Sequence, residues 1–150
     1  MSATKLKYPI MTLGPDEQDD AGCCSLRIFH LNDVYLLDNF PRIKTLIRTN
    51  RTKNSITTLA GDFVAPSLLS SLDKGYGIVD IMNHTPVDLV CFGNHEADLK
   101  MDKLRKRMDE SDFAWINSNM PGFEYDHERR GEKMPPFKIL GRNSIQSKTY

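Results

Sequence analysis

Five polar side chains in the first hundred residues have the chemistry of metal ligands or acid–base groups, and each closely follows an apolar run. The first is Asp33, after residues 26–31, and the second is Asp62, after residues 56–59. The other three, Asn94, His95 and Asp98, come after residues 87–92. Because open α/β sheets place ligand sites at the carboxyl ends of their strands, we expect the three segments to form one site.

The text around these side chains carries a family resemblance. In order and spacing, three segments resemble the first three sequence blocks of the calcineurin-like metallophosphoesterases: Asp33, Gly61-Asp62 and Gly93-Asn94-His95-Glu96. Residues 30–33 and 94–98 are most similar to the 5'-nucleotidase branch, and the resemblance extends over residues 26–120. It implies an α/β fold, the N-terminal portion of a four-layer α/β/β/α sandwich.

The resemblance implies a role for each side chain. Two divalent ions, of manganese, zinc, iron or magnesium, would be bridged by Asp62, with Asp33 on the first and Asn94 on the second. The catalytic imidazole would be His95, which stabilises charge on the phosphoryl group or leaving oxygen, and Asp98 would orient it. The implied reaction is attack of a metal-bound hydroxide on a phosphoric monoester. The implied substrate is a small phosphate ester, with nucleotides favoured.

Two departures from the family pattern leave a second hypothesis about function open. The family's first block reads Asp-x-His, but the third position here is Tyr35. A neutral phenol is a poorer ligand than imidazole, although it can coordinate as a phenolate or leave the position to water. The later blocks that supply histidines, including Gly-His-x-His, have no counterpart in this sequence. The alternative is therefore a catalytically incompetent, truncated remnant that binds only a metal or a partner.

Composition excludes several other classes of protein. With 39% hydrophobic and 27% charged residues in 150, the chain is typical of a soluble globular domain. Basic and acidic residues balance at 20 each, so overall charge predicts neither nucleic acid nor membrane as a partner. Adjacent Cys23 and Cys24, with Cys91 in an expected buried strand, form no disulfide framework. Since no signal peptide is evident, we expect a cytoplasmic protein. The oligomeric state stays open.

The elements that must position the site alternate along the chain. Residues 1–24 are expected to form a flexible leader, and residues 25–150 a partial metallophosphoesterase domain. We expect strands at 26–31, 56–59, 87–92 and 113–116, and helices at 41–49, 66–72, 78–83 and 98–110. This alternation predicts a largely parallel sheet, with Leu99, Leu104 and Met108 turned inward from the last helix.

The remaining segment is predicted to be irregular. Residues 121–136 are polar and charged without a periodic apolar face, which predicts a loop with a solvated His127. A further strand is a candidate at residues 137–140. The family's central sheet continues beyond this point, so we expect the domain to be truncated.

Each candidate also has a structural interpretation. An Asp or Asn that ends a strand commonly forms a turn or caps a helix, and Asn39 is a candidate cap for the helix near Pro41. For Glu96 we expect a charge at the N-terminus of a helix. Taken together, however, Asp33, Asp62 and the residues that follow Gly93 favour a functional site over chance.

Overall fold

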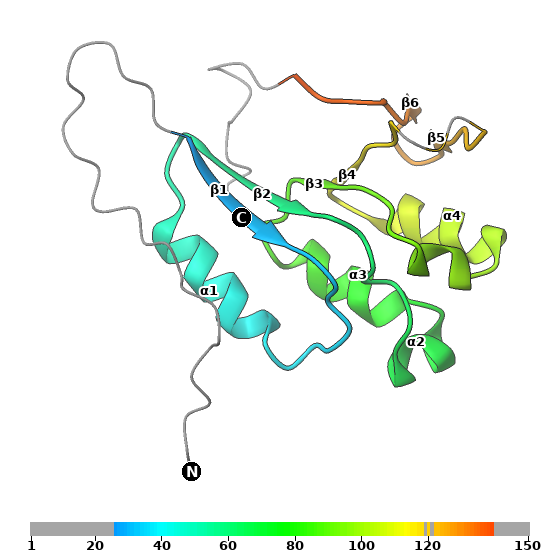
Figure 1. The fold of residues 1–150 in the computed structure, drawn as a ribbon, viewed down its shortest axis with the longest axis horizontal. Coiled ribbons are helices and arrows are strands. Elements are labelled where there is room, and N and C mark those ends of the chain that lie inside the picture. Colours follow the sequence, from blue (N-terminus) through cyan, green and yellow to red (C-terminus); the bar gives the residue numbers. More distant parts are fainter. Residues whose placement is uncertain (1–25, 119, 121, 140–150) are drawn as a thin grey trace.

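A four-stranded parallel sheet lies at the centre of the computed structural model, which describes residues 26–118, 120 and 122–139 (Figure 1). The strands, adjacent in sequence order, are β1 (Arg27–Leu31), β2 (Ser55–Leu59), β3 (Leu89–Val90) and β4 (Ala114–Trp115). Leu59 pairs with Leu31 on one side and Val90 on the other, so these strands end at one edge. The predicted parallel sheet is confirmed. The expected leader lies outside the described residues.

The third and fourth strands are shorter than the predicted 87–92 and 113–116. Ladder hydrogen bonds continue for one residue on each side of β3, from Asp88 N to Thr57 O and from Cys91 N to Leu59 O. Beyond Cys91 the chain leaves the sheet and approaches the loop after β2. Cys91 is therefore half-buried at the strand end, where burial raises the pKa of its thiol, rather than packed inside a strand.

The helices cover one face of the sheet because of the strand order. In the order β1-β2-β3-β4 every crossover advances in one direction, and right-handed crossovers then place all their helices on the same side. Figure 1 shows α1, α3 and α4 on that side. The helices are α1 (Phe40–Asn50), α2 (Leu68–Asp73), α3 (Tyr76–Asn83) and α4 (Met101–Glu110). No helix in the described part is long and apolar enough to cross a membrane.

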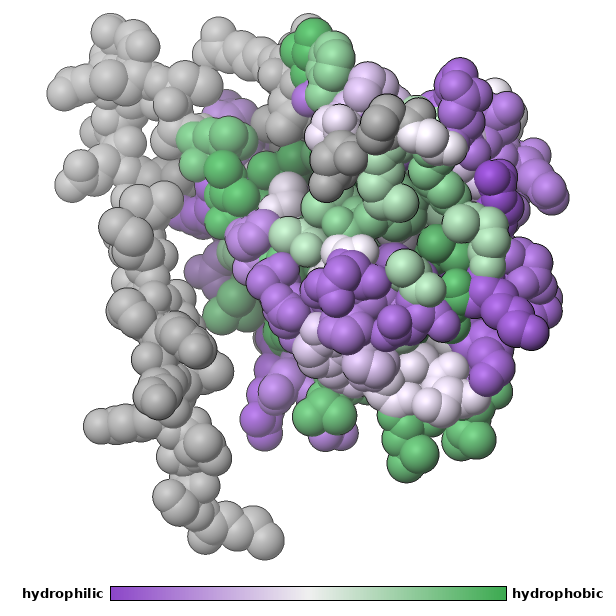
Figure 2. Space-filling view, turned by 45° about the vertical axis from the view of Figure 1, so that its right-hand side comes forward, coloured by the Kyte–Doolittle hydropathy of each residue, from purple (hydrophilic) through white to green (hydrophobic). Residues whose placement is uncertain are grey.

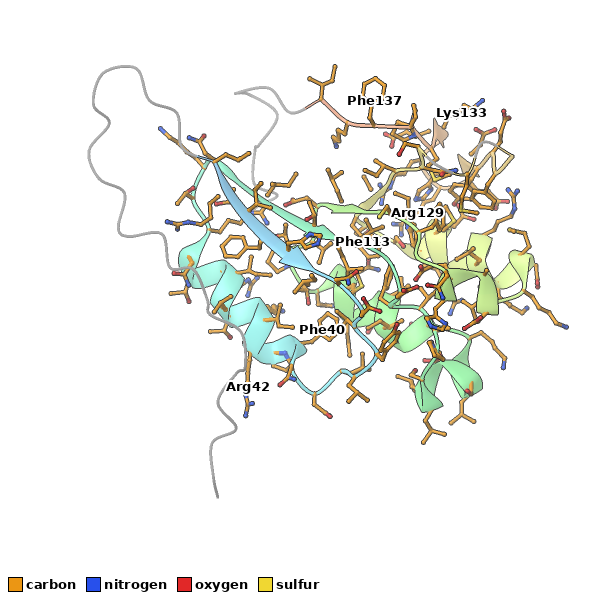
Figure 3. The ribbon with its side chains drawn as sticks, in the orientation of Figure 1. Phe40, Arg42, Phe113, Arg129, Lys133 and Phe137 are labelled. Carbon is orange, nitrogen blue, oxygen red and sulfur yellow. The ribbon has the colours of Figure 1, made fainter. Side chains whose placement is uncertain are left out.

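The core lies between the sheet and these helices. It includes Phe40 of α1, Met82 of α3, Met108 of α4 and Phe113 before β4; Phe40 and Phe113 are labelled in Figure 3. Leu104 and Met108 are buried and Leu99 packs against the core, as the sequence predicted. Burying such side chains supplies most of the driving force for folding.

The helices begin within three residues of the predicted positions, and α1 and α4 differ from expectation in how they begin. Asn39 stands at the N-cap position of α1, but its side chain makes no capping hydrogen bond. The last helix begins at Met101 rather than residue 98, because residues 95–98 form a separate 3₁₀ turn, η1 (His95–Asp98), and Leu99 is extended. By contrast, α2 has a complete capping box between Ser67 and Ser70.

Apolar side chains of α2 face solvent. Figure 2 shows apolar groups at the lower edge of the molecule, the level at which α2 lies in Figure 1. The exposed leucines of this helix are Leu68, Leu69 and Leu72. They follow closely after the loop that ends β2.

The prediction of an irregular loop at residues 121–136 is wrong. A two-stranded antiparallel hairpin occupies it, formed by β5 (Asp126–His127) and β6 (Glu132–Lys133). Strands of two residues are too short to show a periodic pattern, so the sequence carried no signal for them. Residues 137–139, part of the other candidate strand, are irregular and exposed, and residue 140 lies outside the described residues.

The hairpin docks on α4 through buried polar contacts. His127, expected to be solvated, is only 7% exposed, and its Nδ1 lies 3.6 Å from Asp109 Oδ1. The same oxygen accepts from the hydroxyl of Tyr125 and, at 2.8 Å, from the backbone N–H of Glu128. Arg129 extends to the end of α4 and bonds the carbonyl of Ser111 at 3.2 Å (Figure 3). Tertiary contact thus orders a segment that lacks its own apolar face.

One buried carboxylate joins the loops after β2 and β3. Glu96 is 1% exposed and accepts four backbone N–H groups. Its Oε2 accepts from Asp62 at 2.9 Å and Gly93 at 2.5 Å, and its Oε1 accepts from Phe63 at 3.0 Å and Val64 at 3.4 Å. The expectation that Glu96 only places a charge at a helix N-terminus is therefore corrected. Its carboxylate links the backbones of two loops.

Two glycines allow this junction. Gly61 adopts φ +76°, and a Cβ atom there would overlap the backbone of Gly93. A Cβ atom at Gly93 would in turn overlap the carboxylate of Asp62. Since any side chain at either position would push the loops apart, the close approach depends on both glycines.

We expect Glu96→Gln to lower the free energy of unfolding by about 2 to 4 kcal/mol. The glutamine amide keeps the shape of the side chain, but its NH₂ group cannot accept hydrogen bonds from the two N–H groups it would face. Urea unfolding measures the change, and Glu132→Gln, on an exposed side chain in β6, is the matched control. Equal free energies of unfolding for the two variants would contradict the role of Glu96 in linking the loops.

Candidate active site

The loops after β1, β2 and β3 meet at the carboxyl edge of the sheet. Val34 N donates to the carbonyl of Asp62 at 3.0 Å and joins the first loop to the second. His95 N donates to Asp62 Oδ1 at 2.8 Å and joins the third loop to the second. The structure thus brings together the three segments that the sequence marked, with Asp62 in contact with both others.

The two candidate carboxylate ligands have unusual backbone conformations. Asp33 has φ 53° and Asp62 has φ 56°, both in the left-handed region. For residues other than glycine this region costs about 1 to 2 kcal/mol, although Asp tolerates it better than most. Such strain persists where surrounding contacts impose it and is concentrated at functional sites. For Asp62 those contacts include its backbone hydrogen bond to Glu96.

The Asp33 carboxylate is held by its neighbours in the first loop. Tyr35 donates its hydroxyl hydrogen to Asp33 Oδ1 at 2.7 Å, and Asn32 donates its amide to Oδ2. The hydrogen bond to Asp33, followed by burial and nearby carboxylates, raises the pKa of Tyr35 to about 12. The sequence left open whether Tyr35 coordinates a metal as a phenolate or leaves the position to water; in this structure its hydroxyl donates to Asp33.

His95 and Asp98 form the pair that their spacing suggested. His95 Nδ1 lies 2.7 Å from Asp98 Oδ2 across η1. This hydrogen bond is the main cause of a raised pKa for His95, with further contributions from the charges of Asp98, Asp62 and Glu96 against an opposing effect of burial. The side chain is 34% exposed, so a substrate in solution can contact the ring.

The side chains fit a divalent cation by donor type. Asp33 and Asp62 supply carboxylate oxygens, and exposed Asn94, at the start of η1, supplies an amide. These are the ligands that Mg²⁺ and Mn²⁺ prefer. The space at Gly93, which a side chain would fill, is occupied by the Asp62 carboxylate. Within the described ranges no three His, Cys, Asp or Glu side chains are grouped so that they could hold an ion.

The remaining histidines stand apart from this site. His30 contacts Thr58 Oγ1 at 2.8 Å on the sheet, and His84 contacts the Asp80 carbonyl at the end of α3, also at 2.8 Å. Both make hydrogen bonds within the fold, away from the three loops.

The sequence did not predict that Glu96 links the loops after β2 and β3. Its only signal was its position three residues after a glycine at the end of a buried strand, where an acid can reach the free N–H groups of a neighbouring loop. That signal becomes readable only when the loop after β2 is known to lie alongside.

Comparison with known proteins agrees with the geometry. Residues 26–145 match the family model of the calcineurin-like phosphoesterases. A solved structure with the same fold is a candidate 5'-nucleotidase from Staphylococcus aureus in complex with alpha-ketoglutarate, with a TM-score of 0.51 and 18% sequence identity. The match covers 66% of this chain and 23% of that chain. No curated protein sequence matches significantly.

The structural neighbour shows the fold alone at this identity, and this chain spans less than a quarter of it. The family match is more extensive, because it covers most of the chain and includes all three loops of the candidate site. The chain belongs to the calcineurin-like phosphoesterase family.

Proposed function

We propose that this chain hydrolyses phosphoric monoesters at the site formed by its three loops, and that its substrates resemble those of 5'-nucleotidases. One observation carries the proposal: His95 is hydrogen-bonded through its backbone to Asp62 and through its ring to Asp98. An acid–base group is thereby fixed beside a candidate metal-binding carboxylate. Hydrolysis of a phosphate ester needs both functions within reach of one phosphorus atom.

The proposed ligands of two divalent ions are Asp33, Asp62 and Asn94, with Asp62 shared. When bound, such ions supply positive charge to the phosphoryl oxygens and lower the pKa of a bound water molecule. Family members generally use divalent metals. Manganese, magnesium, zinc and iron are all candidates, because oxygen donors can bind each of them.

His95 is proposed to carry the proton for the leaving oxygen. Since Nδ1 faces Asp98, the carboxylate holds a proton on that nitrogen and leaves Nε2 to interact with the substrate. The raised pKa of His95 keeps the ring charged to a higher pH than usual, which favours contact with an anionic phosphoryl group. Asp98 acts through the ring and is a positioning residue.

A second candidate function is binding without turnover. Tyr35 favours it. At this position the family pattern Asp-x-His has an imidazole ligand, whereas Tyr35 donates a hydrogen bond to Asp33. A site with weaker metal binding would still recognise phosphate or a partner through the same loops.

We expect Asp62→Asn to reduce metal-dependent hydrolysis of an aryl phosphate by at least ~100-fold, because a neutral amide cannot bridge two cations as a carboxylate does. The protein is stripped of metal and titrated with Mn²⁺ or Zn²⁺. Asp126→Asn, on the exposed hairpin, should keep wild-type turnover. Equal turnover of Asp62→Asn and wild type at matched metal would refute the proposal. Folded protein that stays inactive at every metal concentration would favour binding without turnover.

We expect Asp98→Asn to lower the pKa of His95. Because the wild-type pKa is raised above its ordinary value of about 6.5, the charged ring persists below the folded-state pKa and is lost as pH rises through it. Removing the carboxylate moves that transition to lower pH, so the alkaline limb of the activity profile moves in the same direction. NMR titration of the ring in metal-free protein measures the pKa directly. Asp102→Asn, an exposed acid in α4, is the control.

A further inference from the structure

Tyr35 connects two loops that are not adjacent in the sheet. Its hydroxyl donates to Asp33 Oδ1 at 2.7 Å in the loop after β1. Its ring meets the ring of His95 edge-on in the loop after β3, with centroids 5.9 Å apart and planes at 88°. In the sheet, β2 lies between β1 and β3, the strands that these two loops follow. One side chain thus contacts both a candidate ligand and the candidate acid.

Each of these two contacts restricts a functional group. A hydrogen bond to a charged carboxylate is stronger than one between neutral groups, and it limits rotation of the Asp33 carboxylate. The edge of an aromatic ring against another ring prefers the perpendicular arrangement seen here. The imidazole is therefore held by Asp98 at Nδ1 and by Tyr35 at its face or edge.

The candidate ligands Asp33, Asp62 and Asn94 all offer oxygen donors. The one imidazole on these three loops, His95, points its Nδ1 at Asp98. Zn²⁺ binds most sites more tightly than Mn²⁺, but imidazole ligands widen that difference and oxygen ligands narrow it. The residue type at position 35 therefore bears on which cation the site takes.

We propose that Tyr35 is a positioning and selectivity residue, which orients Asp33 and His95 and keeps the cation site beside Asp33 an oxygen-donor site with a small preference for Zn²⁺ over Mn²⁺. The proposal rests on the proposed function only in the identity of the residues that hold the cation. It assigns to Tyr35 a role as hydrogen-bond donor to a ligand, distinct from the role of a ligand.

The test is cation binding to metal-free protein in the absence of substrate. Mn²⁺ binding is measured by the EPR signal of the free ion, and Zn²⁺ binding by competition with a chromophoric chelator. Tyr35→Phe keeps the ring and removes the hydrogen bond, so Mn²⁺ affinity should fall about 10-fold, in the range for loss of a partner that orients a ligand. Tyr35→His adds a nitrogen donor and should raise the ratio of Zn²⁺ to Mn²⁺ affinity about 10-fold or more.

Tyr76→Phe is the matched control. Tyr76 is exposed at the start of α3, and its ring lies beneath the guanidinium of Arg107 at 5.3 Å. Removing its hydroxyl should leave both affinities unchanged. Thermal unfolding of every metal-free variant verifies that it is folded. If Tyr35→Phe is unfolded, the affinity ratio of Tyr35→His still tests the selectivity.

Three results would overturn the proposal: wild-type Mn²⁺ affinity in folded Tyr35→Phe, an unchanged affinity ratio in Tyr35→His, or no cation binding by the wild-type chain. Because no substrate is present, failure of the proposed hydrolysis is scored separately. Cation binding with the expected changes but without turnover would reject hydrolysis and keep the role of Tyr35. Turnover by the wild-type chain, with cation affinities unaltered in both variants, would keep hydrolysis and reject the role of Tyr35.

Discussion

The buried carboxylate of Glu96 is the interaction on which the candidate site depends. Four backbone N–H groups in two loops donate to it, and without an acceptor they would be left unpaired at the edge of the core. The converging N–H dipoles stabilise the buried charge. One of those donors is Asp62 N, and Glu96 itself follows His95. The same side chain therefore fixes the backbone of a candidate ligand and of the candidate acid.

Strand order supplies the second constraint. With neighbours in sequence also neighbours in the sheet, the loops after β1, β2 and β3 emerge side by side at one edge. The helices pack on one face of the sheet. On β1, Ile28 is 59% exposed. The sheet thus brings the three loops to one edge, and the glycines at 61 and 93 allow two of them to approach closely.

Sequence patterns predicted the parts of this molecule whose signals are local. Strand β2, buried along nearly its whole length, and α4, with Leu104 and Met108 one turn apart, have unambiguous patterns. The pairing of His95 with Asp98 also follows from spacing along the chain. The hairpin that contains His127 could not be predicted, because Asp109, some twenty residues earlier, orders it. The roles of Glu96 and Tyr35 could not be predicted for the same reason, since each also contacts a residue in another loop.

The charges at the candidate site bear on the proposed cation. Four carboxylates gather there, but they differ in what balances them. Glu96 is balanced by backbone N–H groups, and Asp98 by the imidazole of His95. Asp33 and Asp62 have no ion pair with a basic side chain within the described ranges, and their partners are a phenol, amides and backbone groups. Two neighbouring carboxylates of like charge repel each other, and a divalent cation between them would turn that repulsion into attraction.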